Sequence, residues 1–275
     1  MDQPDCVVYQ AAGSYADSHC GQDWLNTLGR TQGIGKWCLA VDADELLVFS
    51  SRDAGSLVEW IPRLEAEGAE GVYALMVDMC ATEPLSEVRY CAPEPFWECC
   101  DYFDPKGYFD VGFVDCPHTG IWGGVRQRLF YPEYTRRSFG DYLRWGIGLI
   151  ARKTPGLCAT NLVNLSYTMP PLLSKVPLVK WGEHTRYLPA TDFVTKLKLS
   201  DFRAALLHLK FLGDFHDNAM REAARKEHYD GAREYVRYLC YLKKNRDLQP
   251  FTPEIVRYEG VESLGKYDLI RASDR

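Results

Sequence analysis

Residues 36–50, KWCLAVDADELLVFS, are the stretch around which the rest of the chain can be interpreted. An apolar run leads into three carboxylates, Asp42, Asp44 and Glu45, and a second apolar run follows them. Carboxylates are rarely buried without a partner, because removing one from water costs several kcal/mol. The pattern therefore predicts a buried strand whose acidic part lies at a cleft or contacts cations.

The spacing of the acidic residues suggests a metal site. Alternation along a strand places Asp42 and Asp44 on one face, with the small Ala43 between them. Two carboxylates at this spacing suit a hard divalent cation, Mg²⁺ or Mn²⁺, that is shared with a phosphate. A solvated turn is the alternative, because D-x-D is a short motif. The flanking apolar runs favour a ligand site at the carboxyl end of a strand in an open α/β sheet.

The composition is that of an ordinary folded domain. The chain has 275 residues, 46% hydrophobic and 25% charged, which allows a sizeable core. A net charge of −6 argues against a general nucleic-acid-binding protein. The ten cysteines include no C-x-x-C pair and do not resemble a zinc site or a disulfide framework. No signal peptide or apolar run of ~20 residues is visible, so we expect a cytoplasmic protein whose membrane contact, if any, is peripheral and on the inner face.

Hydrophobic periodicity predicts the elements. The first fifty residues have the order strand (6–9), helix (22–32), strand (36–50), which is typical of a parallel α/β sheet. The later elements are a helix at 57–67 between Ser56 and Gly68, strands at 71–79, 111–114, 123–130, 173–181 and from 202, and helices at 214–228 and 231–244. Residues 1–250 are taken as a single domain, and 251–275 as a polar surface tail.

Several charged residues on these predicted strands are candidates for a site. Asp78 lies near the end of one strand. It is either a general base or a group that supports the residues of the site, or else a surface or capping aspartate. Arg126 and Arg128 share a face of another predicted strand, where they would bind a diphosphate or an acidic acceptor, or remain solvated. His208 is either a satisfied core residue or, if it meets the acidic strand, a metal ligand. The aromatic, proline-containing segment 81–110 packs either against an acceptor sugar or against itself.

The ordered set of motifs resembles the bacterial family 2-like glycosyltransferases, whose pattern is a tryptophan-led strand that ends in D-x-D-E. The matching pieces are WCLAVDADELLVF (37–49), VDM (77–79), GGVRQRLF (123–130), SKVPLVKW (174–181) with His184, LLHLKFLGDF (206–215) and EAARKEHYDGAREYVRY (222–238). Together they cover roughly residues 5–240.

This resemblance implies a GT-A type fold, in which an α/β core with a mixed central sheet, flanking helices and C-terminal helices holds a nucleoside-diphosphate sugar through Mn²⁺ or Mg²⁺. It implies a glycan or lipid-linked acceptor, bacterial polysaccharide synthesis and an inverting displacement. Carried over by position, Asp42 lies toward the ribose, Asp44 and His208 hold the metal and Glu45 supports it. The remaining donor-side candidates are Lys175, Arg126, Arg128 and His184.

The chemistry of sugar transfer is compatible with these residue types. The reaction expels a nucleoside diphosphate, whose developing charge a metal and cationic side chains stabilise. The acceptor hydroxyl must also lose a proton to a base within hydrogen-bond reach. Asp78 is the first candidate for this base, followed by Asp115 and Glu83.

The chain departs from the family in one respect: only about forty residues precede the D-x-D motif, and the sequence therefore resembles an N-terminally short member. One possibility is that the true start of the protein lies upstream of Met1. A second is that a partner or a second copy of the chain completes the sheet at an exposed edge. The third possibility is a truncated relative that binds a glycan or a protein without catalysis. A metal-dependent phosphoryl or nucleotidyl transferase is a further alternative, against which stands the lack of a G-x-x-x-x-G-K-[ST] loop.

Overall fold

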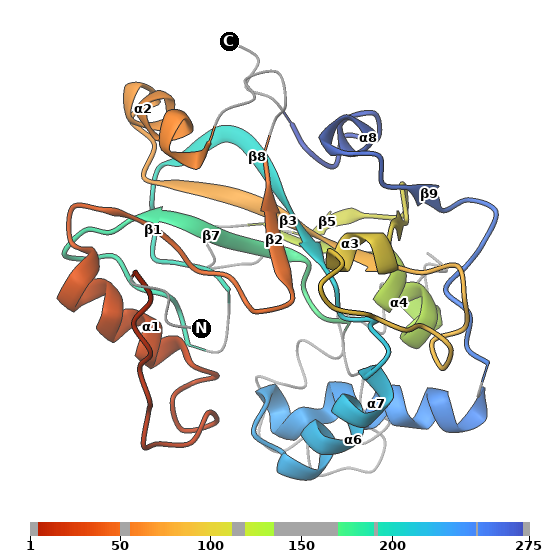
Figure 1. Cartoon of the computed structure of the whole chain (residues 1–275). Helices are drawn as coiled ribbons and strands as arrows, with labels where there is room; N and C mark the ends of the chain where they lie inside the picture. Colours follow the sequence, from red (N-terminus) through yellow and green to blue (C-terminus); the bar gives the residue numbers. More distant parts are fainter. Residues whose placement is uncertain are drawn as a thin grey trace.

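A mixed seven-stranded sheet forms the centre of the molecule (Figure 1). The computed structural model describes residues 5–49, 56–111, 119–134, 170–189, 192–245 and 247–271. The main strands, in spatial order, are β1 (Trp37–Leu39), β7 (Ser174–Lys180), β3 (Gly71–Cys80), β8 (Leu199–His208) and β2 (Glu45–Val48). Only β3 and β8 run parallel, whereas the β1–β7, β7–β3 and β8–β2 pairs are antiparallel.

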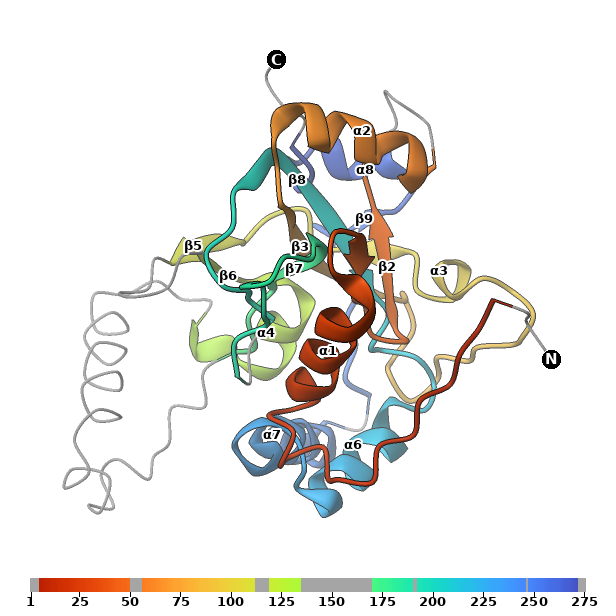
Figure 2. The same ribbon diagram turned by 90° about the vertical axis from the view of Figure 1, so that its left-hand side faces the viewer.

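Helices cover both ends of this sheet. α2 (Leu57–Glu67) and α8 (Val261–Gly265) lie at one end, and α6 (Phe215–Arg225) and α7 (Tyr229–Lys244) lie at the other (Figures 1 and 2). The smaller elements are α1 (Gln22–Leu28) with the π-helical turn η1 (Gly29–Gly33), α3 (Phe96–Cys99), α4 (Gly124–Phe130), η3 (Pro132–Tyr134), the strands β4 (Tyr102–Phe103) and β9 (Val256–Arg257), and the β5 (Phe109–Val111) and β6 (Gly120–Trp122) hairpin. The fold is therefore mixed α/β, as expected.

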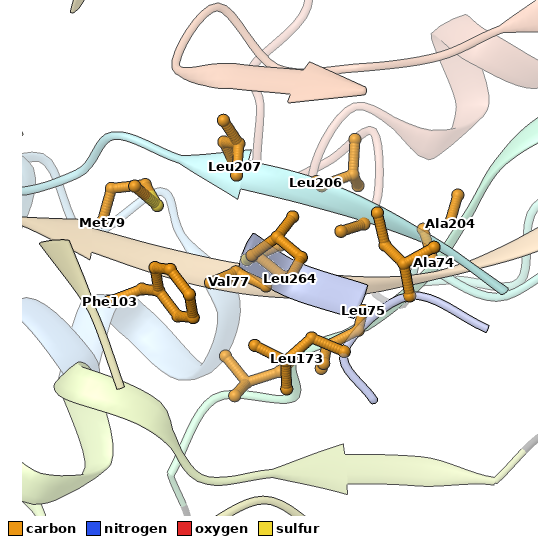
Figure 3. Packing of buried hydrophobic residues seen from close by; sticks show 14 of the residues in the cluster. Ala74, Leu75, Val77, Met79, Phe103, Leu173, Ala204, Leu206, Leu207 and Leu264 are labelled. Atoms are coloured by element: carbon orange, nitrogen blue, oxygen red, sulfur yellow. The ribbon is translucent and has the colours of Figure 1, made fainter. Parts of the chain in front are cut away.

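The core lies on β3 and β8. Side chains of both strands are buried on both faces of the sheet, together with Leu173, Phe103 and Leu264 (Figure 3). The expectation of a polar surface tail after residue 250 is wrong, because Leu264, Leu269 and Ile270 join this core. Val256, Tyr258, Val261 and Tyr267 of the same segment also pack against this core.

Several predicted elements are confirmed. The helix at 57–67 is α2, and a capping box between Ser56 and Glu59 starts it, while Gly68 with φ 69° ends it. The strands at 71–79, at 173–181 and from 202 correspond to β3, β7 and β8, and the two C-terminal helices correspond to α6 and α7. The helix at 22–32 is α1 continued by η1.

Two N-terminal predictions are wrong. Residues 6–9 form no strand and are exposed, with Val8 at 87% exposure. Residues 36–50 form two strands rather than one, because the chain turns at the acidic residues and β2 pairs with a different neighbour from β1. The expected parallel β-α-β start is therefore replaced by antiparallel pairing of β1 with β7.

The predicted strand at 123–130 is the helix α4. Its start depends on two glycines, Gly123 with φ 134° and Gly124 with φ 67°, in backbone conformations that side chains disfavour. A Cβ on Gly123 would also lie 2.6 Å from the carbonyl oxygen of Gly107. The apparent alternation of apolar and polar residues in this short run was compatible with either structure.

Two further expectations concern membrane-spanning helices and the state of the cysteines. Each helix in the described part of the chain is too short or too polar to cross a lipid bilayer. The described cysteines are free thiols, and Cys80 and Cys100 are buried. Residues 112–114 and 138–168 lie outside the described residues.

Candidate functional site

The D-x-D-E motif forms the turn between β1 and β2. The backbone N–H of Leu209 donates to the carbonyl of Asp44 at 2.8 Å, which attaches this turn to the end of β8. The N–H of Glu45 donates to the carbonyl of Asp42 at 3.1 Å and closes the turn. The acidic residues are therefore placed by sheet pairing, and not by alternation along one strand.

Lys175 gathers three carboxylates on one side of this turn. Its Nζ lies 2.8 Å from Glu45 Oε2, 3.2 Å from Asp42 Oδ2 and 3.7 Å from Asp192 Oδ1. The side chains of Lys175 and Glu45 are buried, whereas that of Asp42 is 72% exposed. Burial lowers the pKa of Lys175, but the carboxylates more than offset it and hold the pKa above its ordinary value.

Glu45 is consequently committed to the lysine. Its Oε2 accepts from Lys175 Nζ and from the backbone N–H of Asp42 at 3.0 Å. Burial raises the pKa of Glu45 even though Lys175 opposes this effect. The structure therefore separates Glu45 from the two other residues that were expected at the metal.

Asp44 and His208 lie together on the other side of the turn. Asp44 Oδ2 is 3.5 Å from His208 Nε2, and His208 Nδ1 is 2.8 Å from Asp78 Oδ1. Burial alone would raise the pKa of Asp44, but His208 and Lys210 bring it well below its usual range. Burial and Arg126 lower the pKa of His208, and its contacts with Asp44 and Asp78 outweigh them, so that this pKa is raised.

Asp78 is fully buried beneath His208. Its Oδ2 accepts hydrogen bonds from the backbone N–H of Arg126 at 3.2 Å and from Arg126 Nε at 3.1 Å. Burial alone would raise the pKa of Asp78, yet Arg126 and His208 lower it to about 2. A weakly basic carboxylate with no exposed surface is a poor candidate for the base that deprotonates an acceptor, so the geometry does not favour that expected role.

The two arginines of α4 diverge instead of sharing a face. Arg126 is buried against Asp78, and its Nη1 also lies 3.6 Å from Glu234 Oε1. Arg128 makes two hydrogen bonds to Asp104, at 3.0 and 2.9 Å, and donates to the carbonyl of Pro250. Residues two apart point in different directions on a helix, so the expectation that Arg126 and Arg128 share one face is wrong.

The other expected site residues lie apart from this cluster or outside the described chain. His184 is exposed in the turn that follows β7, and Glu83 is also exposed. Asp115 lies outside the described residues. Of the aromatic residues in segment 81–110, Tyr90 and Phe96 pack against each other with ring centroids 4.6 Å apart.

A cavity of about 600 Å³ adjoins the turn on the side of Asp42. Its walls come from the N-terminal segment, α1, the end of β1 and the loop after β7, and include Tyr15, Trp24, Leu28, Tyr187, Asp42 and Asp192. Asn26 attaches α1 to that loop, because its side chain exchanges two hydrogen bonds with the backbone of Tyr187, at 3.0 and 2.7 Å. Figure 2 shows α1 and the N-terminal segment from this side.

Apart from Asp42 and Lys175, sequence reasoning missed the residues that line this cavity. Tyr15 and Trp24 lie in a segment that was interpreted only as loop and helix, and their rings are 6.1 Å apart at an interplanar angle of 58°. Asp192 follows no motif that could have signalled it. Three of the four aromatic residues on the cavity wall thus come from the first thirty residues, and Tyr187 is the fourth.

Asp44 and His208 are the candidate ligands for a metal ion. Asp44 and His208 present one carboxylate and one imidazole nitrogen toward each other. Within the described ranges, no three His, Cys, Asp or Glu side chains come together as a metal-binding group. The pair is compatible with Mg²⁺ or Mn²⁺, which in many sites takes one or two carboxylates and completes its shell with phosphate oxygens and water.

Four distant parts of the sequence therefore meet at one point. The turn after β1 supplies Asp42 and Asp44, β7 supplies Lys175, and β3 and β8 supply Asp78 and His208. No protein-family model, curated protein or solved structure matches the chain. Any proposal for the function of this chain therefore rests on the geometry of this site.

Proposed function

We propose that this chain is a metal-dependent glycosyltransferase with a GT-A-like fold, which transfers a sugar from a nucleoside-diphosphate sugar to a hydroxyl group of a glycan or lipid-linked acceptor. The observation that carries the proposal is the placement of the two aspartates of D-x-D. Asp42 lies on the wall of the cavity, and Asp44 lies 3.5 Å from His208. A single turn thus adjoins an apolar hollow and a pair of metal-type donors.

The cavity suits the nucleoside end of such a donor. Its volume of about 600 Å³ is within the ~300–1,000 Å³ typical of small-molecule sites. Tyr15 and Trp24 offer aromatic surface to a flat base. Asp42 is exposed and ionisable, so that it can accept hydrogen bonds from ribose hydroxyls, and Lys175 holds it in place at 3.2 Å.

Asp44 and His208 would hold the metal beside the diphosphate. When bound, Mn²⁺ or Mg²⁺ would supply positive charge to the leaving nucleoside diphosphate. Lys210 adds a cation close to Asp44, because its charge contributes to the low pKa of that carboxylate. The Nζ of Lys210 lies 3.3 Å from the hydroxyl of Tyr235. The charge of Lys175 is instead neutralised by its three carboxylates.

Thermal unfolding with Mn²⁺ and a panel of nucleoside diphosphates tests this proposal. A ligand at ~100 times its Kd adds about 2.7 kcal/mol, which for a chain of this size corresponds to a rise in Tm of about 5 °C. The variant Asp44→Ala should lose the Mn²⁺-dependent part of this rise. Asp247→Ala, at an exposed carboxylate outside the site, is the control and should retain it.

The reaction products separate the alternatives. Incubation with nucleoside-diphosphate sugars and Mn²⁺ should release the nucleoside diphosphate, whereas phosphoryl or nucleotidyl transfer would release a nucleoside monophosphate or pyrophosphate. A truncated, non-catalytic relative would bind nucleotide or glycan without turnover. The absence of any thermal shift with all nucleoside diphosphates would refute the proposed function.

A further inference from the structure

The contact between Asp78 and His208 defines which nitrogen of the imidazole is available. Asp78 and His208 are partners in the parallel register of β3 and β8, and Asp78 Oδ1 lies 2.8 Å from His208 Nδ1. A carboxylate held by an arginine accepts hydrogen bonds and donates none. Nδ1 therefore carries a proton. The carboxylate of Asp44 is farther from the ring, with its Oδ2 3.5 Å from Nε2, so a neutral imidazole keeps its single proton on Nδ1 and its lone pair on Nε2.

Asp78 is itself held in one orientation. Its Oδ2 accepts from both the backbone N–H and the Nε–H of Arg126, and Arg126 Nη2 contacts the sulfur of Met76 at 3.1 Å. Glu234 lies 3.6 Å from Arg126 Nη1 on the far side. Arg126 is consequently occupied within the protein. Its Nε also lies 2.9 Å from Asp78 Oδ1, so the guanidinium contacts both carboxylate oxygens, and Oδ1 is the oxygen that also faces His208.

We propose that Asp78 is a positioning residue: it holds His208 in the tautomer that carries its proton on Nδ1, so that the Nε2 lone pair faces Asp44 and a metal ion. This inference rests on the proposed function for the identity of the ligand, but the tautomer is a property of the metal-free protein. Carboxylates that orient a metal-binding histidine in this way affect metal affinity through the imidazole. Asp78 thereby acts without contacting substrate.

The variant Asp78→Asn makes a specific prediction. The amide oxygen is expected at the position of Oδ2, because an amide nitrogen there would oppose two N–H donors of Arg126, whereas at the position of Oδ1 it would oppose only Nε. The amide nitrogen then faces His208 Nδ1 and donates to it, which moves the imidazole proton to Nε2. The same change of tautomer is expected wherever an asparagine replaces an aspartate that orients a histidine.

Nitrogen-15 NMR of the histidine side chains in the metal-free protein tests the inference directly. At a pH where His208 is neutral, wild type should show a protonated Nδ1 and an unprotonated Nε2. Asp78→Asn should show the reverse, and its Mn²⁺ affinity, measured by electron paramagnetic resonance of free Mn²⁺, should fall by about 10–100-fold. A proton on Nε2 in wild type would overturn the proposal even if the variant fails to fold.

Asp104→Asn is the matched control, because Asp104 is also a buried carboxylate paired with an arginine of α4. It should lower stability without changing the His208 tautomer or the Mn²⁺ affinity. If Asp104→Asn lowers Mn²⁺ affinity as much as Asp78→Asn does, the effect is general destabilisation and the positioning role is refuted. If wild type has the expected tautomer but binds no Mn²⁺ or nucleotide, the proposed function fails while the assigned orientation of His208 stands.

Discussion

Removal of Lys175 should destabilise the fold far more than removal of an equally close lysine at the surface. Lys175→Met would leave Glu45, whose side chain is 1% exposed, without its cation. Breaking a buried pair in this way typically costs about 3–5 kcal/mol, because one uncompensated charge remains. For a chain of 275 residues this corresponds to a decrease in Tm of about 5–9 °C.

Lys180→Met is the comparison. Lys180 Nζ lies 2.9 Å from Glu65 Oε1, nearly the same distance, but both side chains are at least 40% exposed. Such pairs contribute at most about 1 kcal/mol. Urea unfolding of wild type and both variants measures the difference, and the double variant Lys175→Met with Glu45→Gln should recover part of the loss. Equal effects of Lys175→Met and Lys180→Met would refute the reasoning that burial decides the contribution.

Two more predictions concern His228, which immediately precedes α7, and Gly29, the first residue of η1. Burial lowers the pKa of His228 below its ordinary value of 6.5, although Glu222 opposes this effect. The neutral imidazole therefore contributes to stability above pH 6.5, and this contribution is lost as the pH falls through the folded-state pKa. Thermal unfolding across pH should show less acid destabilisation in His228→Gln than in wild type, and identical pH profiles of the two proteins would contradict this prediction. Gly29→Ala should lower the free energy of unfolding by about 1–3 kcal/mol or more, because the added Cβ would lie 2.0 Å from Trp181 Cε2. Gly13→Ala is the control, because a Cβ there would meet no atom within 4 Å. It should have little effect in the same urea assay.

Local signals in the sequence were sufficient for several elements. The Ser56–Glu59 capping box and Gly68 define α2 at the expected residues, because helix ends depend on side chains a few positions apart. The continuous apolar run in β3 likewise identified a buried strand. The same local view failed for 123–130, where the backbone conformation of Gly123 and Gly124 outweighed the alternation of side chains.

The sequence by itself determined that acidic residues would interrupt an apolar run, that they needed cationic or metal partners, and that His208 was one possible partner. Only the tertiary structure decided how those partners are distributed. Lys175 binds Glu45, and Asp78 joins His208 through the register of β3 and β8. The residues of these pairs are 130 positions apart in the sequence, and their meeting depends on which strands pair and in what register, for which the pattern within a single strand contains no information.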